Sequence, residues 1–240
     1  MAASKTTWKH RMITFYWNAA PNPAKVALYL EESGLPYQIV PVDSRKGEQH
    51  TDAFTAINPN AKLPAIVDDG VVVFDSNAIL LYLAHKCGQF LPPDTPQARA
   101  DMLSWLMFIA SGIGPYSGQA VHFHRYAPEP IAYAIERYDF EAWRHWSIIE
   151  ARLSRQRYLV GDCYTMVDMA LWGWARVATA VLGDAAMEKL VNVKRLLDEI
   201  NLRPAAQRAE ALKARYPLKT VMDEEARKAF FPHTTNPEAG

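Results

Sequence analysis

The sequence predicts an α/β plus all-α protein, in which a small sheet-containing domain precedes a purely helical one. Up to about residue 90, short β-branched and aromatic runs alternate with helix-like segments, whereas afterwards only helical spacing continues. A proline-rich connector, LPPDTP, occupies residues 91–96 between the two patterns. We therefore expect one domain over residues 12–90 and a second over 97–216. Residues 217–240 lose clear periodicity, which predicts an extended tail.

The first domain is expected to have the element order βαβαββα. Gly34 follows a helix-like segment and can supply the left-handed conformation that ends a helix. The turn signal Asp68-Asp69-Gly70 separates two short β-branched runs, which predicts a hairpin. The expected elements are a strand over 13–17, a helix over 23–33, a strand over 37–42, a short helix or turn over 51–56, a hairpin over 65–74 and a helix over 76–86.

Local patterns also indicate helices in the second domain. Apolar or small residues recur at spacings of three and four from Ile131 to Leu153, which predicts a long amphipathic helix within a bundle. Thr165 and Asp168 have the spacing of a capping box, so a largely buried helix is expected to start there. Residues 102–124 contain no Asp, Glu, Lys or Arg, but serine, glycine and proline interrupt them. We expect a broken buried helix there rather than a membrane span.

The composition favours a compact, soluble enzyme. Half of the 240 residues are hydrophobic, and 26 basic side chains balance 26 acidic ones, so the chain can bury a full core. No basic block is present, which argues against nucleic-acid binding. The N-terminus lacks the apolar core of a signal peptide, and the two cysteines, Cys87 and Cys163, are expected to be reduced structural thiols. These observations favour the cytoplasm.

Residues 58–76 carry the strongest functional signal. Leu63-Pro64 stands just before a strand-like run, where we expect a cis peptide bond that turns the backbone of Leu63 outward. A backbone presented in this way can pair with an extended ligand. Ser76 opens the next apolar stretch with a side chain typical of an N-cap, and a helix N-terminus favours a carboxylate. Together these features can bind a small peptide.

Six motifs follow one another along the chain: KGEQH (46–50), INPNAKLPAI (57–66), SNAILLYLA (76–84), GQ (118–119), YAIERY (133–138) and MDEEAR (222–227). Their joint order resembles that of cytosolic glutathione transferases, and of the bacterial Nu class in particular. The resemblance implies a thioredoxin-like N-terminal domain, a glutathione-transferase-type helical bundle and a homodimer. It also implies glutathione, reduced or as the disulfide, as cosubstrate without a metal. The implied reaction is reduction of small or mixed disulfides, or of peroxides, by the glutathione thiolate.

Asn22 is the candidate catalytic residue. It lies in the first strand-to-helix turn, directly before a proline, so we expect it at an N-cap, where its amide could donate to the glutathione sulfur. Alternatively, Asn22 only caps its own helix. The Nu class usually has a threonine where this chain has Ala20, so one hydroxyl donor is missing. Asn18 could partly replace it, or could simply serve the turn.

The resemblance also implies a set of glutathione-binding residues. Ser76 is expected to donate to the α-carboxylate of the γ-glutamyl group, and Asp75 to pair with its ammonium, where the family more often has glutamate. Gln49 and Lys62 are expected near the glycyl carboxylate, and Leu63 is expected to pair with the peptide through its backbone. The residues alone leave alternatives open. Gln49 and Lys62 could be solvated loop residues, and Asp75 could be an acid of the first helical turn that interacts with the helix dipole.

A second substrate is expected between the domains. Its pocket is predicted to be bordered by residues 111–116, by His122 and Phe123, and by Trp172, although aromatic side chains in such places are more often core. Arg137 in YAIERY is implied to reach a second glutathione, with a surface ion pair as the alternative. His122 and His124 have no acid or cysteine cluster beside them in the sequence, so we expect no metal site.

Two other functions stay open for the same site. The thiolate could attack carbon instead of sulfur, in conjugation, dehalogenation or aryl-ether cleavage. Alternatively, the chain could be a noncatalytic binding protein of the same shape. Ala20 supports that last alternative, whereas the presence of Asn22, Gln49, Asp75 and Ser76 speaks against it.

Overall fold

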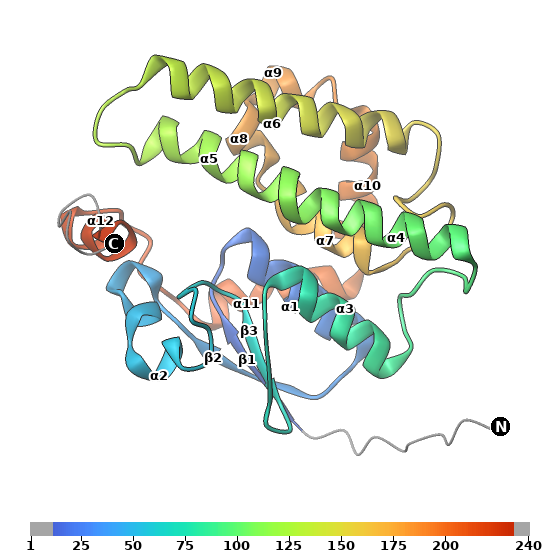
Figure 1. The fold of residues 1–240 in the computed structure, drawn as a ribbon, viewed down its shortest axis with the longest axis horizontal. Coiled ribbons are helices and arrows are strands. Elements are labelled where there is room, and N and C mark those ends of the chain that lie inside the picture. The colour runs from blue at the N-terminus through green and yellow to red at the C-terminus, as the bar shows by residue number, and fades with distance from the viewer. Residues whose placement is uncertain (1–11, 233–240) are drawn as a thin grey trace.

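The computed structural model describes residues 12–232 and contains a β-sheet with flanking helices, followed by a layer of long helices (Figure 1). The first part of the chain agrees with the expected element order, apart from two added 3₁₀ turns. Its elements are β1 (Ile13–Trp17), α1 (Pro21–Ser33), β2 (Tyr37–Pro41), η1 (Ser44–Lys46), η2 (Glu48–His50), α2 (Asp52–Thr55), β3 (Ala65–Asp68), β4 (Val71–Phe74) and α3 (Ser76–Cys87).

The four strands form one sheet in the order β2-β1-β3-β4. β1 pairs in parallel with β2 and antiparallel with β3, and β3 pairs antiparallel with β4. This is the mixed sheet of a thioredoxin-like domain, so the predicted fold class is confirmed. Two local predictions are also confirmed. The Leu63-Pro64 peptide bond is cis, and Gly34 ends α1 with a φ of 69°.

The second part of the described chain is helical. In Figure 1, α4, α5 and α6 lie in one long layer, and α7 lies between this layer and α1. The elements are α4 (Pro96–Phe108), η3 (Ile109–Ile113), α5 (Gly114–Arg125), α6 (Ala132–Leu153), α7 (Met166–Ala175), α8 (Ala178–Leu182), α9 (Asp184–Met187), α10 (Val191–Asn201), α11 (Pro204–Arg215) and α12 (Glu224–Phe230).

The predicted break within residues 102–124 is a π-helical turn, η3, which joins α4 to α5. Pro115 has no N–H group, so it cannot continue the α-helical ladder at this point, and a π turn accommodates the lost bond. Gly112 lies in the same turn, and a Cβ atom there would lie only 2.4 Å from Cδ2 of His145. The turn therefore brings this helix close against α6.

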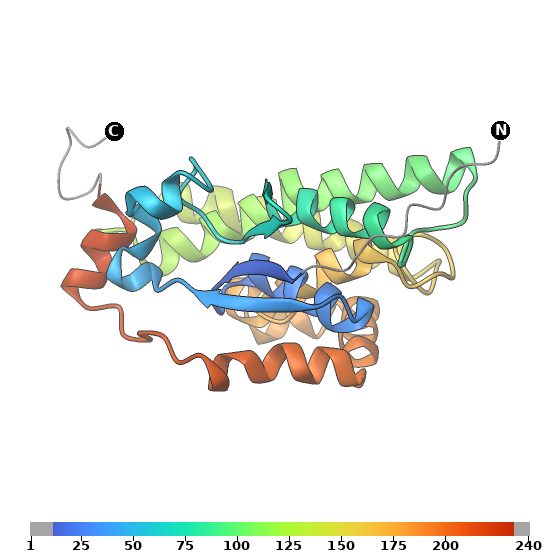
Figure 2. The same ribbon diagram turned by 90° about the horizontal axis from the view of Figure 1, so that it is seen from below.

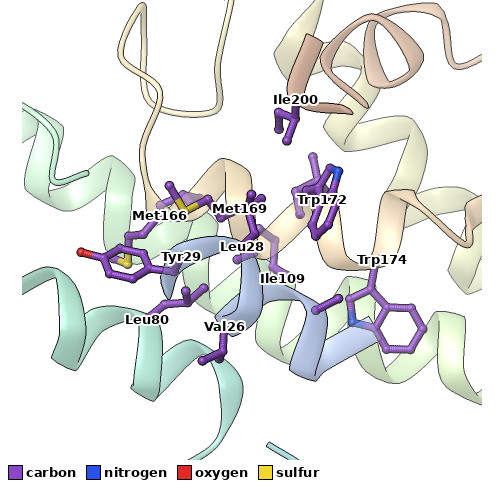
Figure 3. Close-up of a cluster of buried hydrophobic side chains, with 14 of the residues drawn as sticks. Val26, Leu28, Tyr29, Leu80, Ile109, Met166, Met169, Trp172, Trp174 and Ile200 are labelled. Carbon is purple, nitrogen blue, oxygen red and sulfur yellow. The ribbon is translucent and has the colours of Figure 1, made fainter. Parts of the chain in front are cut away.

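Helix α7 joins the two parts of the molecule through one buried core (Figure 3). All ten of its residues are buried. The predicted capping box at its start is confirmed, because Asp168 Oδ2 accepts from Thr165 N at 2.9 Å and Thr165 Oγ1 accepts from Val167 N at 3.3 Å. Core residues labelled in the figure are Val26, Leu28 and Tyr29 of α1, Leu80 of α3, Ile109 of η3, Met166, Met169, Trp172 and Trp174 of α7, and Ile200 of α10.

The expectation of an extended tail was wrong for residues 224–230, which form α12. Asp223 caps this helix by accepting from Ala226 N at 2.9 Å, and seven residues are too few to reveal a helical period. Figure 2 shows the chain running from α11 beside β2 and along the molecule to α12. Positions 233–240 of the expected tail lie outside the described residues. None of the helices between residues 12 and 232 has the length and apolar character that a membrane crossing requires.

Candidate functional site

A cavity of about 650 Å³, here called the interdomain cavity, lies where the first turns of α1 and α3 face α5 and α12. Four predicted site residues line it: Asn22, Lys62, Asp75 and Ser76. Another cavity of about 700 Å³ is lined by Ala19, by Arg176 and Val177 after α7, and by residues of α10 and α11, but by none of the predicted site residues. We therefore place the candidate site in the interdomain cavity.

Asn22 lies in the first turn of α1, but it is not the N-cap. Ala20 takes that position and Pro21 begins the helix, so the predicted cap at Asn22 was wrong. Instead, Asn22 Oδ1 accepts from Trp174 Nε1 at 3.0 Å. An indole N–H can only donate, so the atom that faces Trp174 must be the amide oxygen. The NH₂ group of Asn22 consequently points away from Trp174 and is available to a ligand in the cavity.

Trp174 on α7 was not identified from the sequence, which pointed to Trp172 instead. Trp172 is buried away from the interdomain cavity and donates to Asn201 Oδ1 at 2.8 Å, so its predicted place was wrong. Trp174 fits against two glycines of α5. A Cβ atom at Gly114 would lie 3.2 Å from Trp174 Nε1, and one at Gly118 would lie 3.7 Å from Cη2. These glycines leave room for the indole.

The first turn of α3 supplies the opposite wall. Asp75, at a φ of 69°, is the N-cap, and its Oδ1 accepts from Asn77 N at 2.8 Å and from Ala78 N at 3.1 Å. Ser76 is the first residue of the helix, so its predicted capping role was wrong, although it lines the cavity as expected. The start of α3 therefore presents a carboxylate acceptor, a hydroxyl and a helix N-terminus at one point. This arrangement suits a group that carries both an ammonium and a carboxylate.

Lys25 is the second site residue that the sequence did not reveal. It lies on α1 with only 1% of its surface exposed, and its Nζ donates to Ser76 Oγ at 3.3 Å and to Asn77 Oδ1 at 3.4 Å. Loss of hydration on burial lowers the pKa of Lys25 to about 7, and the charge of Asp75 partly opposes this shift. A buried lysine thus lies directly behind Ser76.

The loop before β3 reaches the cavity through Lys62, which is exposed. Lys62 O accepts from the side chain of Asn58, which holds the loop in place. Leu63, the residue before the cis proline, is half-buried and precedes β3. Its backbone makes no hydrogen bond to another residue within 12–232. Its N–H and C=O are therefore available for pairing with an extended ligand.

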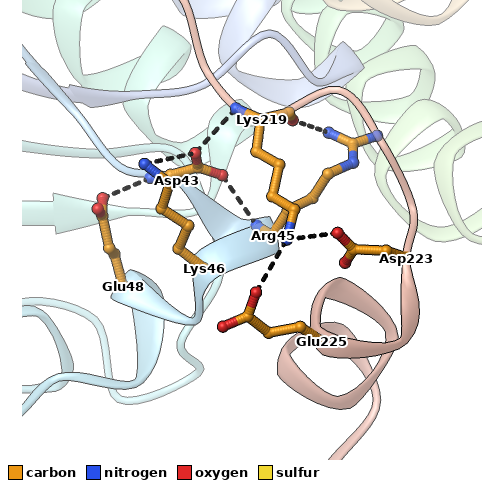
Figure 4. Close-up of polar contacts among 7 residues, drawn as sticks. All are labelled: Asp43, Arg45, Lys46, Glu48, Lys219, Asp223 and Glu225. Atoms are coloured by element: carbon orange, nitrogen blue, oxygen red, sulfur yellow. Dashed lines mark hydrogen bonds and ion pairs between the residues drawn. The ribbon is translucent and has the colours of Figure 1, made fainter.

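Residues 217–231, here called the C-terminal strap, close one end of the site. The strap is fastened to η1, because Lys219 N donates to Asp43 Oδ2 at 2.9 Å and Arg45 Nη1 donates to Lys219 O at 3.2 Å (Figure 4). Lys219 Nζ also pairs with Asp223 at 2.9 Å and with Glu225 at 3.2 Å. The strap is therefore held by side chains from both its own helix and the sheet domain.

Gln49 does not line the interdomain cavity. It is buried, and its Nε2 donates to Ala229 O in α12 at 3.3 Å, while its Oε1 is buried without a partner among residues 12–232.

On the cavity side of α12, the Phe231 ring lies 4.9 Å from the ring of His122 and 5.7 Å from that of Tyr126. All three of these rings line the cavity, which gives it an aromatic wall.

Comparison with known proteins identifies the family of this chain. The family model described as "Glutathione S-transferase, N-terminal domain" matches residues 19–86, and the one described as "Glutathione S-transferase, C-terminal domain" matches residues 141–204. The chain belongs to the glutathione S-transferase family. Among its relatives is the disulfide-bond oxidoreductase YfcG of Escherichia coli (strain K12), 42% identical over 205 residues, which cover 82% of this chain and 94% of that protein.

Two crystal structures of glutathione transferases are also similar to this one. A family member from Pseudomonas fluorescens pf-5 with two glutathione bound has a TM-score of 0.79 and 34% identity, covering 85% of this chain and 95% of that one. A glutathione transferase from Pseudomonas putida with one glutathione disulfide bound per subunit has a TM-score of 0.77 and 32% identity, covering 83% and 90%.

Several residues predicted for this glutathione S-transferase lie outside the interdomain cavity. Arg137 is half-exposed on α6 and pairs with Glu141 at 3.0 Å, so its implied contact with a second glutathione stays a prediction. Of the other predicted borders, Gly114, Pro115 and His122 line the cavity, whereas Phe123 stacks on Tyr138 with 5.3 Å between ring centroids.

The remaining polar candidates have local partners. Asn18 holds the turn before α1, since its Nδ2 donates to Ser44 Oγ at 3.0 Å and its Oδ1 accepts from Ala20 N at 3.1 Å. Cys87 and Cys163 form no disulfide bond, and Cys87 Sγ lies 3.1 Å from Tyr29 Oη. Over the described part of this transferase, no three His, Cys, Asp or Glu side chains are grouped as a metal site would require.

Proposed function

We propose that this protein is a glutathione-dependent disulfide reductase of Nu-class type. The first turns of α1 and α3 face one cavity, and this observation carries the proposal. The turn of α1 contributes the Asn22 amide, and the start of α3 contributes Asp75 and Ser76. A thiol needs a donor at sulfur, and a γ-glutamyl group needs a carboxylate site beside an ammonium site. The name of YfcG and the glutathione-bound relatives support this assignment.

In the proposed complex, Ser76 and the N-terminus of α3 bind the α-carboxylate of the γ-glutamyl group, and Asp75 Oδ2 accepts from its ammonium. Asp75 Oδ1 is already occupied by Asn77 N and Ala78 N. The cysteinyl part pairs with the backbone of Leu63, and Lys62 faces the glycyl carboxylate. This orientation directs the thiol toward Asn22.

The proposed reaction consists of two thiol–disulfide exchanges. The first glutathione thiolate attacks one sulfur of the substrate disulfide and expels the other as a thiolate. A second glutathione thiolate then attacks the resulting mixed disulfide and releases the second substrate thiolate. Two glutathione thiols are oxidised to glutathione disulfide while one substrate disulfide is reduced to two thiols. The NH₂ of Asn22 stabilises the attacking thiolate, and the protein itself is not oxidised.

A homodimer in the cytoplasm is part of the proposal. Val72 and Phe74 of β4, together with Leu103 and Met107 of α4, each expose between 43% and 50% of their surface. Exposed apolar side chains of this kind on a sheet edge and a helix are common at interfaces between subunits. Light scattering of the purified protein tests the dimer. A mass equal to that of one chain would count against the dimer.

The function is tested by glutathione-dependent reduction of 2-hydroxyethyl disulfide, measured beside conjugation of 1-chloro-2,4-dinitrobenzene. We expect strong reduction and weak conjugation. Conjugation without reduction would instead assign the site to carbon electrophiles, and binding of glutathione without turnover in either assay would favour a noncatalytic protein. The Asn22→Ala variant serves as the matched protein control, since it keeps the α3 subsite intact.

A further inference from the structure

Lys25 lies in a place that lysine side chains rarely occupy. It is fully buried between α1, the first turn of α3 and α7. Burying an ammonium group is unfavourable unless it is hydrogen-bonded. Gly173 of α7 makes the room, because a Cβ atom there would lie 2.5 Å from Lys25 Cγ and 2.5 Å from Pro21 O. The stem is thus confined, and within residues 12–232 the ammonium donates to two side chains of α3, Ser76 and Asn77.

The hydrogen bonds of Lys25 fix the direction in which Ser76 can donate. When Lys25 is protonated, its ammonium has three N–H donors and no acceptor, so in that form Ser76 Oγ accepts from Lys25. The hydroxyl hydrogen of Ser76 then points to another partner, and Ser76 faces the interdomain cavity. Asn77 Oδ1 accepts a second bond from the same ammonium. The arrangement keeps Ser76 as a donor to whatever anion binds at the start of α3.

We propose that Lys25 is a positioning residue, which orients the Ser76 hydroxyl and adds a buried positive charge behind the bound carboxylate, so that ligand binding draws a proton onto Lys25. The proposal rests on the proposed function, because it places the γ-glutamyl carboxylate at Ser76. It adds to that function a coupling between glutathione binding and protonation.

The charged groups around Lys25 determine the direction of the coupling. On α3, Asp75 raises the pKa of Lys25, but burial dominates and leaves it at about 7. The part of α7 that touches Lys25 is Gly173, which carries no charge, and Lys62 and His122 line the same cavity. From α11, Arg208 pairs with Glu31 near the far end of α1.

Without ligand, the lysine is therefore largely neutral above pH 7. A carboxylate bound at Ser76 favours the charged form and raises the pKa of Lys25. Between the two pKa values the complex binds a proton that the free protein lacks, so affinity falls as pH rises above 7.

The test is calorimetric titration of the full chain with S-methylglutathione, which has no thiol to titrate, in buffers of different ionisation enthalpy. At pH 8 we expect uptake of about half a proton per ligand, and a dissociation constant about three- to tenfold higher at pH 8.5 than at pH 7. Because this measurement uses the unaltered protein, it does not depend on whether a variant folds.

Two variants assign the proton. Lys25→Met should abolish the uptake and bind about tenfold more weakly at pH 6.5, with affinities converging at pH 8.5. Lys62→Met, which removes the exposed lysine of the same cavity, should keep the uptake. Binding without proton uptake, or uptake that persists in Lys25→Met, would overturn the inference but leave the proposed function intact. Absence of binding at every pH would overturn both.

Discussion

Trp174 and Asn22 are 152 positions apart in the chain and are joined by a 3.0 Å hydrogen bond from the indole N–H to the amide oxygen. Trp174 lies on α7 and Asn22 on α1, the two helices that hold the sheet domain and the helical domain together. The bond therefore fixes the orientation of the amide that faces the cavity, using a residue from the other domain. This dependence can be tested.

Trp174→Phe keeps an aromatic ring but removes the donor. We expect turnover in the disulfide assay to fall several-fold with a smaller change in KM, because the Asn22 amide is no longer held in one orientation. Stability should decrease by about 1 kcal/mol for the lost hydrogen bond. Trp172→Phe is the matched control, since it loses a similar indole bond, to Asn201, outside the cavity. Equal loss of turnover in both variants would contradict a role for the orientation of Asn22.

Asn22→Ala removes the amide itself. Turnover should fall by about tenfold, more than the affinity for glutathione, because a donor to the thiolate acts on the reacting sulfur rather than on the tripeptide as a whole. Steady-state kinetics with varied glutathione separates the two effects. Asn18→Ala is the control from the same loop, where the side chain is engaged by Ser44 and Ala20. If Asn22→Ala turned over at the same rate as the parent, Asn22 would have no role in the mechanism.

Ser76→Ala and Asp75→Ala should differ in what they lose. Asp75 is the N-cap of α3 and faces the ligand ammonium, so Asp75→Ala should destabilise the fold by about 1 kcal/mol in addition to weakening glutathione binding. Ser76→Ala should lower glutathione affinity by about tenfold and leave the cap in place. Urea unfolding and calorimetric titration measure the two quantities. If Ser76→Ala lowered the free energy of unfolding by about 1 kcal/mol and left glutathione binding unchanged, Ser76 would be a helix cap and not a ligand-binding residue.

The ligand-free protein should become more stable as pH rises from 7 to 9, through Lys25. The folded-state pKa of about 7 lies below the ordinary value of 10.5, so in this window the unfolded chain binds a proton that the folded chain lacks. This proton binding favours the unfolded chain at pH 7 and weakens as the pH rises. The free energy of unfolding should therefore increase by about 2 kcal/mol between pH 7 and 9. The measurement is the free energy of unfolding in urea at each pH, compared with Lys25→Met. A parallel pH dependence in the parent and Lys25→Met would refute the assignment, and Lys62→Met should match the parent.

Where the signal was local, the sequence predicted the structure well. The bend at Leu63-Pro64, the helix end at Gly34 and the capping box at Thr165 each depend on neighbouring residues alone, and all three are present. Caps were harder to place. Asp75 and Ser76 can both cap a helix, and the choice was made by the backbone, since Asp75 adopts a φ of 69° and its carboxylate reaches two N–H groups.

The missed site residues depend on long-range contacts. Lys25 is a charged residue in a helix, and nothing in the sequence distinguishes it from a solvated lysine. Its burial depends on Gly173, Ser76 and Asn77, which lie far along the chain. Trp174 and Trp172 stand two positions apart on one helix, so they point in different directions, and the sequence does not say which one faces α5. α12 was missed because its helix is short.

The glycine at position 173 has a further consequence, for how this site can change in evolution. α1 carries Asn22 and Lys25, α7 carries Trp174, and the two helices meet where the missing Cβ of Gly173 leaves space. Any larger residue there would displace the thiol subsite and its supporting wall together. New substrate preferences are therefore most accessible at the C-terminal ends of α5 and α12, where His122, Tyr126 and Phe231 can be exchanged while the glutathione half of the site is retained.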